Sequence, residues 1–180
     1  MKHTQLVFGM SLSNTKPGKS QSKYEYINPN DIDKLSNLYN ISHEWRKTLS
    51  SLYPCLLSID NLSFNSIEHY IQYRKIKLAD DEKSYLFTRE SGSHIGLGNG
   101  YMARNNRKMV ILTNVQLHQW DSIISDVKSI AKNAKFSIKL FHDILLATQD
   151  AELWSIAPRC KPIRMYNCEI LRSKLQMVEV

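Results

Sequence analysis

The stretch FNSIEHYIQYRK, from Phe64 to Lys75, decides how the middle of the chain folds. It predicts the start of a helix that runs from Asn65 to about Ala79. Glu68, Gln72 and Lys75 are spaced so that they share one face of that helix. An acid, an amide and an amine in one column are typical either of a solvent-facing surface or of a reaction site.

Glu68 also has a purely structural interpretation. Asn65 and Glu68 have the spacing of a capping box, with Asn65 as the N-cap and Glu68 reaching back to a backbone N–H group. Such a pair stabilises a helix by about 1 kcal/mol and needs no chemistry. Gln72 and Lys75 are ordinary helix formers, so periodicity alone favours a face that is turned to water.

Two further segments carry clear patterns. Leu56–Phe64, with the sequence LLSIDNLSF, alternates around Asp60-Asn61 and predicts a small hairpin. In Trp120–Ala134 the apolar residues follow the 3.6-residue period, which predicts an amphipathic helix. The other expected elements are a strand within Thr4–Leu12, helices or turns at Ile32–Tyr39 and Glu44–Leu52, a strand or core segment at Lys108–Leu112, and helices at Ser137–Ala147 and Tyr166–Met177.

The length and composition fit one globular domain. A chain of 180 residues, of which 42% are hydrophobic and 23% charged, can bury a core of its own. Residues 1–30 are expected to form a strand and a polar linker, and residues 31–180 the domain itself. We therefore expect an α+β fold: a mostly helical single domain with a small β element around residues 55–64.

The net charge, the cysteines and the histidines indicate which partners and which cellular compartment to expect. A net charge of +7 favours a phosphate-bearing partner such as a nucleotide, ADP-ribose or a nucleic acid. Cys55, Cys160 and Cys168 form no CxxC pair, which is typical of reduced thiols in a cytoplasmic protein. The histidines lack metal-ligand spacing, so no metal site is expected. No apolar stretch is long enough to span a bilayer, so no membrane partner is expected.

A glycine-rich segment, SGSHIGLGNG from Ser91 to Gly100, predicts a loop. Backbone N–H groups around Gly98 could cradle a phosphate, with the basic side chain of Arg104 close behind in the sequence. An ordinary surface loop explains the same glycines, so both interpretations stay open.

The pattern LSxxYPxxxxIDxxxFxSxEHYxQYxK, from Leu49 to Lys75, resembles the NADAR family, the YbiA-like N-glycosidases associated with NAD and ADP-ribose. Three later blocks resemble family blocks in the same order. They are a helix that opens at Trp120, the pair Lys135-Phe136, and LLATQDAEL from Leu145 to Leu153. The resemblance covers residues 35–153 and implies a YbiA-like fold.

The chain departs from the family pattern after LLATQDAEL. The family continues with a glutamate and then an aspartate followed by a Trp-Gly pair, whereas this chain reads WSIAPRCKPIRMYN. Trp154 or Ser155 stands where the glutamate would be, and Cys160 falls near the aspartate position. The family's early asparagine matches Asn37 if LSNLY is the equivalent block, and it is replaced by Ser51 if LSSLYP is.

The resemblance implies cleavage of an N-glycosidic bond at C1 of a ribose, without a cofactor. The substrate would be an ADP-ribosylated nucleobase, such as guanine in DNA, or a phosphoribosyl metabolite. Glu68 would stabilise the cationic transition state or activate the attacking water. Lys75 would bind a phosphate or form a Schiff base with the ring-opened sugar. Substrate-binding roles would fall to Asn37, Gln72 and Trp120. Gly98 and Arg104 are added as substrate-binding residues on the pattern of the glycine-rich loop alone, because the segment Tyr85–Lys108 has no clear family counterpart.

The loss of the later acidic block leaves an alternative function open. A non-catalytic relative would keep the pocket and bind ADP-ribose or a nucleotide without hydrolysing it. A second carboxylate, supplied by Asp121 or Glu169, would favour the enzyme. A structural or interaction protein on the same scaffold is a third alternative.

Overall fold

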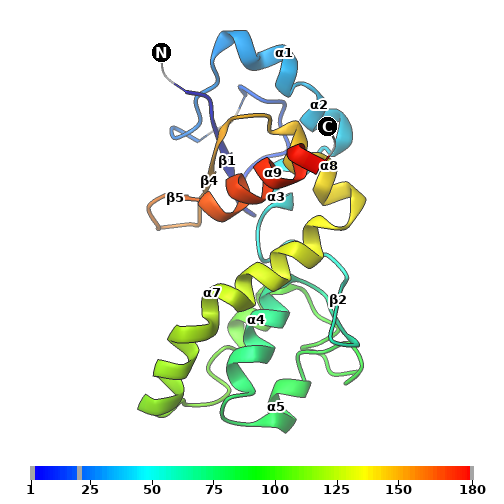
Figure 1. Cartoon of the computed structure of the whole chain (residues 1–180), viewed down its shortest axis with the longest axis vertical. Helices are drawn as coiled ribbons and strands as arrows, with labels where there is room; N and C mark the ends of the chain where they lie inside the picture. The colour runs from blue at the N-terminus through cyan, green and yellow to red at the C-terminus, as the bar shows by residue number, and fades with distance from the viewer. Residues whose placement is uncertain (1–2, 20–21, 179–180) are drawn as a thin grey trace. The chain divides into compact units, whose positions relative to one another are not determined.

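The computed structural model describes residues 3–19 and 22–178. The chain divides into two compact units: unit 1 consists of residues 1–50 and 138–180, and unit 2 of residues 51–137. Both units contain helices and strands (Figure 1). The prediction of a mostly helical α+β fold is confirmed, and the proposed division after residue 30 stays a prediction.

Unit 1 contains a three-stranded sheet in the order β1-β4-β5. Strand β1 (Gln5–Phe8) runs parallel to β4 (Glu152–Ser155), which pairs antiparallel with β5 (Ile163–Arg164). Leu6 lies opposite Leu153, and both side chains are fully buried. The strand expected within residues 4–12 is therefore present, but the sequence pattern predicted neither β4 nor β5.

Short helices and two longer ones complete unit 1. The predicted helix at 137–147 is present as α8, and the predicted C-terminal helix as α9, each with ends that differ by no more than a residue or two. Buried side chains of unit 1 include Phe8, Leu38, Trp45 and Leu145. The helices are a 3₁₀ turn at Pro29–Asp31, α1 (Ile32–Leu35), α2 (Asn37–Ile41), α3 (Trp45–Thr48), α8 (Lys139–Ala147) and α9 (Tyr166–Val178).

Unit 2 opens with the predicted hairpin. Strands β2 (Leu57–Ile59) and β3 (Leu62–Phe64) pair antiparallel. The two turn residues between them, Asp60 and Asn61, have φ angles of 52° and 61°. A two-residue turn with both central residues in the left-handed region matches the twist of the strands, and Asp and Asn tolerate that region well. The hairpin prediction is confirmed.

The long helix of unit 2 is α7 (Asn114–Phe136), which starts earlier than the predicted Trp120. Thr113 and Gln116 form a complete capping box at its N-terminus. The periodic positions Trp120, Val127 and Ala131 are buried, as the amphipathic pattern predicts. Figure 1 shows α7 beside α4 (Ile67–Ile76), and the two helices contact each other. The remaining helices of the unit are α5 (Asp81–Tyr85) and α6 (Gly100–Asn105).

The segment 108–112 forms no strand, so that alternative was wrong. Met109 and Val110 pack against a buried apolar cluster, whereas Ile111 is 93% exposed. The segment is therefore half a core segment and half a surface turn. Within the described ranges, no helix combines the length and the apolar composition needed to cross a membrane.

Candidate functional site

Helix α4 begins differently from the prediction. Its N-cap is Ser66, whose hydroxyl oxygen accepts a hydrogen bond from the His69 N–H group. The Asn65 side chain instead donates to the Gly98 carbonyl at 3.1 Å and accepts from Arg89. The predicted capping box of Asn65 and Glu68 is therefore wrong, because another hydroxyl caps the helix and Asn65 holds a loop. Glu68 is left free for other contacts.

The Glu68 carboxylate is buried and accepts hydrogen bonds from three side chains. Gln72 Nε2 donates to one oxygen at 2.9 Å, while Ser51 Oγ and Arg104 Nη2 donate to the other at 3.3 and 3.2 Å. The Glu68 side chain is only 8% exposed. A buried carboxylate is costly unless donors compensate it, and here an amide, a hydroxyl and a guanidinium do so. Because Gln72 shares the helix face with Glu68, part of the predicted column is confirmed as a contact.

The Gln72 amide has one atom without a partner. Its Nε2 donates to Glu68, and a carboxylate accepts only, so the amide orientation follows from that contact. The opposite atom, Gln72 Oε1, is buried and has no hydrogen-bond partner among the described residues. Buried acceptors of this kind are rare in folded proteins. It is therefore open to a donor that the protein itself does not supply.

Lys75 is the third residue of the column, and its side chain is half-buried. Within the part of the chain that the structure describes, its amine makes no hydrogen bond or ion pair. Its position three residues after Gln72 places it on the same side of α4. An ammonium group without a carboxylate partner is available to an anion.

Arg104 reaches Glu68 from a separate helix. Asn99 caps α6 by accepting from the Met102 N–H group, and Gly100 follows at the first helical position. A Cβ atom on Gly100 would lie 2.5 Å from the Leu52 carbonyl oxygen, so only glycine allows this close approach. The Arg104 side chain remains 40% exposed although it pairs with Glu68. Arg104 is therefore far more exposed than Glu68 and borders solvent.

The glycine-rich loop also belongs to this unit. Gly98 lines a cavity of about 470 Å³ together with Asn65 and Arg89. The predicted phosphate cradle stays a prediction, but Asn65 and Arg89 give this loop a hydrogen-bonded link to the start of α4.

The other candidates selected from the sequence lie in different surroundings. Trp120 is buried in α7, at 7% exposure, as expected of a core anchor. Asn37 is exposed and starts α2 in unit 1. Asp121 is exposed on α7, and Glu169 accepts hydrogen bonds from the Leu153 N–H group and from Arg164. Glu169 is thus used within unit 1.

Sequence reasoning named Ser51 only as an alternative to Asn37, yet Ser51 contacts Glu68 directly. Its hydroxyl donates to the carboxylate, and its carbonyl accepts from the Glu68 N–H group at 3.0 Å. The LSSLYP block carries the signal, because it precedes the hairpin that leads into α4. No group of three metal-ligating side chains gathers anywhere in residues 3–19 and 22–178.

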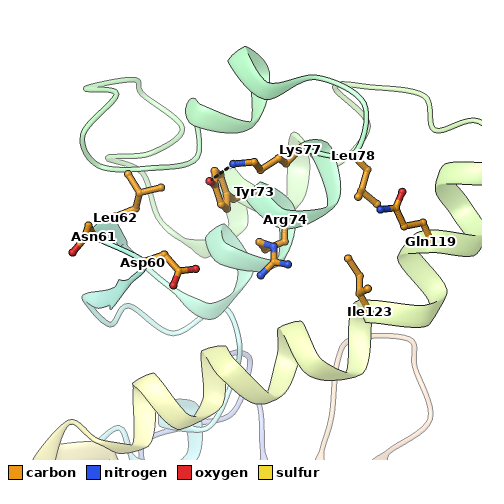
Figure 2. Close-up of a pocket in the computed structure, with 9 residues that line it drawn as sticks. All are labelled: Asp60, Asn61, Leu62, Tyr73, Arg74, Lys77, Leu78, Gln119 and Ile123. Carbon is orange, nitrogen blue, oxygen red and sulfur yellow. Dashed lines mark hydrogen bonds between the residues drawn. The ribbon is translucent and has the colours of Figure 1, made fainter.

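The opposite face of α4 lines a larger cavity, of about 830 Å³. Figure 2 shows Arg74 between the hairpin turn and Ile123 of α7, and Lys77 bonded to Tyr73. Arg74 donates to the Tyr70 hydroxyl at 2.8 Å, and Lys77 also lies 3.8 Å from Asp81. Neither Glu68 nor Lys75 lines this cavity. Its cations already have protein partners, in contrast to Lys75.

Comparison with known proteins shows which known fold this chain resembles. No protein-family model and no curated protein matches the chain. The NMR structure of the E. coli protein YbiA is similar, with a TM-score of 0.57 and 17% sequence identity over 99% of this chain and 89% of that chain. This chain has a YbiA-like fold. At such low identity the likeness concerns the fold alone, and the YbiA-like fold expected from the sequence is confirmed.

Proposed function

We propose that the protein is a NADAR-type N-glycosidase or ADP-ribosyl hydrolase. It would cleave the bond between a ribose C1 and a base, in an ADP-ribosylated nucleobase such as guanine in DNA or in a phosphoribosyl metabolite. The observation that carries the proposal is the buried Glu68 carboxylate, held by Gln72, Ser51 and a partly exposed Arg104. The YbiA-like fold adds support by analogy.

Glu68 would act on the charge that develops during cleavage. An N-glycosidic bond breaks through an oxocarbenium-like transition state, in which C1 and the ring oxygen become positive. A carboxylate held by three donors cannot rotate away, so it is already oriented when that charge appears. The same oxygens could instead accept the proton of the attacking water. Either role contributes about 10²–10⁴-fold to the rate.

The neighbouring residues would bind the sugar and its phosphates. Gln72 Oε1, the buried acceptor without a partner, suits a ribose hydroxyl as donor. The Lys75 amine suits a phosphate, because an ammonium group and a phosphate form a strong charge-assisted hydrogen bond. Arg104 is 40% exposed and can turn from Glu68 towards a ligand phosphate without unfolding α6. Ligand binding would then release the carboxylate for catalysis.

A second function is favoured by one specific observation. Among the described residues, the contacts of Glu68 include a cation and two neutral donors but no second carboxylate. If Arg104 keeps the Glu68 charge neutralised when ligand is bound, the site would hold ADP-ribose or a nucleotide without hydrolysing it. This is the non-catalytic alternative.

The test combines turnover with binding. Wild-type protein and Glu68→Gln are incubated with an ADP-ribosylated guanine oligonucleotide and with phosphoribosyl metabolites, and released base is measured. We expect Glu68→Gln to lower kcat by about 10²-fold or more and to leave ADP-ribose affinity nearly unchanged, because glutamine keeps the shape and loses the charge. The matched control is Glu82→Gln, the same change on the exposed face of α5 in the same unit.

The outcomes separate the two functions. Full activity of Glu68→Gln on a substrate that the wild type cleaves would overturn the mechanism. Binding of ADP-ribose by the wild type without cleavage of any substrate would favour the non-catalytic alternative. If the wild type neither binds ADP-ribose nor cleaves any of the substrates, both proposed functions are wrong.

A further inference from the structure

A separate cavity lies in unit 1, over one face of the small sheet. Its volume is about 540 Å³, and it is lined by Gln5, residues 23–26, Trp154 and residues 161–162. Gln5 pairs with both Glu152 and the bridge residue Tyr26, and Trp154 follows two residues after Glu152. Paired residues and residues two apart share a face of a sheet. The cavity has a size typical of small-molecule sites.

The walls of this cavity are fixed by backbone hydrogen bonds. Gln5 and Tyr26 exchange bonds of 2.6 and 3.1 Å, and Trp154 pairs with Arg164 of β5. The indole N–H group of Trp154 also donates to Glu152 at 3.2 Å, which holds the ring in one orientation. A ligand would meet an indole ring that is already oriented, so binding would lose little side-chain entropy at Trp154.

Three aromatic rings line the cavity without being packed into the core. Tyr24 is 41% exposed, and Tyr26 and Trp154 are half-buried. By contrast, the indole of Trp45 in the same unit is fully buried. Every nucleobase has a flat face that stacks on such rings, whatever its sequence.

The charge around these rings is positive. Lys23 and Lys161 are exposed, and neither forms an ion pair among the described residues. The Lys23 amine lies 5.2 Å from the centre of the Tyr24 ring, so Tyr26 and Trp154 offer the rings for stacking and Tyr24 positions a cation beside them.

Glu25, the carboxylate in the lining, is bound by both terminal nitrogens of Arg46 and is 3% exposed. Its charge is therefore compensated inside the protein. Two lysines without a carboxylate partner, next to stacking surfaces, favour a ligand that joins a phosphate to an aromatic ring.

We propose that this cavity binds a nucleoside phosphate. The base stacks on Trp154 and Tyr26, and the phosphate contacts Lys23 and Lys161. The same chemistry occurs in a free nucleotide and in one nucleotide of a single strand. The site uses unit 1 residues only, so it does not depend on the function proposed for Glu68.

The test measures binding of two probes to the full chain. A fluorescein-labelled thymidine oligonucleotide is titrated by fluorescence anisotropy, and AMP by calorimetry. The variants are Trp154→Leu and the double change Lys23→Glu with Lys161→Glu. The control is Lys174→Glu, which changes an exposed lysine on α9 of the same unit. Circular dichroism checks the fold, and the lysine variants keep the test valid if Trp154→Leu does not fold.

The expected losses follow from stacking and from counterion release. Trp154→Leu should lower the affinity for whichever probe binds by about 5- to 100-fold, because one base loses its stacking partner. For a single strand, the double lysine change should reduce the slope of log K against log salt by about 1.4, that is, about 0.7 for each lost phosphate contact. Lys174→Glu should stay within about 2-fold, because surface charges away from a contact are screened.

Each outcome decides the proposal. Binding of the oligonucleotide but not AMP supports a strand, and binding of AMP supports a free nucleotide. If neither probe binds, or if the variants bind like the wild type, the proposal is wrong. It is also wrong if Lys174→Glu weakens binding as much as the lysine pair does, since only net charge would then matter.

Discussion

Each unit holds one buried glutamate paired with an arginine, and the two pairs differ in their access to solvent. In unit 1, Arg46 and Glu25 have side-chain exposures of 1% and 3%, and both terminal nitrogens of Arg46 contact the carboxylate. In unit 2, Glu68 is 8% exposed, but its partner Arg104 is 40% exposed and makes a single contact at 3.2 Å. We call the first pair closed, because both side chains are shielded from solvent, and the second open, because its arginine is solvent-accessible.

The surroundings of the two pairs extend this difference. Arg46 also donates to the Lys16 carbonyl and lies over the Trp45 ring, so its donors and its flat face are used by the protein. Next to Glu68, Gln72 Oε1 lacks a partner and Lys75 has an unused amine. An ion pair whose members are both buried and fully bonded within the protein is typical of a structural role. An open pair with unsatisfied neighbours is what a binding site requires.

The largest predicted effect concerns stability. Arg46→Met should lower the free energy of unfolding by about 3–5 kcal/mol, because it leaves the Glu25 charge buried and unpaired. Arg104→Met should cost less, about 0–1 kcal/mol, because its guanidinium is partly hydrated in the native state and Gln72 and Ser51 still donate to Glu68. Urea denaturation of both variants measures the difference.

A double variant sharpens this test. Glu25→Leu combined with Arg46→Met should recover much of the loss, since replacing both members of a buried pair removes the unpaired charge. Equal destabilisation by Arg46→Met and Arg104→Met would contradict the distinction between a closed and an open pair.

The next prediction compares Lys75 of α4 with Lys77, the C-cap residue of the same helix, which points to the other side. Lys75→Ala should weaken ADP-ribose binding about 10- to 100-fold, the loss of one charge-assisted hydrogen bond. Lys77→Ala should leave the affinity within about 2-fold, because Lys77 lines the other cavity, where charges are screened from the Glu68 face. Its hydrogen bond with Tyr73 raises the pKa of Lys77, so the control removes a fully charged amine. Calorimetry with ADP-ribose measures both variants.

An equal loss of affinity in Lys75→Ala and Lys77→Ala would indicate a non-specific charge effect. The ligand would then not bind specifically at the face of α4 that carries Glu68.

The smallest predicted effect tests how far the Glu68 charge reaches. Burial lowers the pKa of His69 below its usual 6.5, while the Ile95 carbonyl and the Glu68 charge oppose this shift. Glu68→Gln removes a negative charge that favours the imidazolium, so the pKa of His69 should fall further. An NMR titration of the imidazole measures it, and Glu82→Gln should leave the value unchanged. An unchanged or raised pKa of His69 in Glu68→Gln would contradict this coupling between the two side chains.

The lowered pKa of His69 also makes the free energy of unfolding depend on pH. Below about pH 6.5 the unfolded chain binds a proton at His69 that the folded chain resists. The contribution of neutral His69 is therefore fully present above pH 6.5 and is lost as the pH falls below it. Urea denaturation between pH 7 and pH 5 should show this fall, and it should be steeper in Glu68→Gln.

Local patterns predicted part of the fold and part of the site. The hairpin followed from Asp60-Asn61 and the core of α7 from its 3.6-residue period, because turns and amphipathic faces depend on neighbouring residues. The contact between Glu68 and Gln72 followed from their spacing on one helix. The cap of α4 did not, because Asn65 and Ser66 are both good N-caps and the loop contact of Asn65 decided between them.

The sequence by itself determined the α+β class, the hairpin turn, the long amphipathic helix and the polar column on α4. Only the tertiary structure decided that β1 joins β4, since that pairing links Gln5 to Glu152 across most of the chain. It also decided that Arg104 and Ser51 reach the Glu68 carboxylate, while Arg46 closes over Glu25. Short-range periodicity specifies which residues share a face, but burial and charge pairing arise only when distant segments meet.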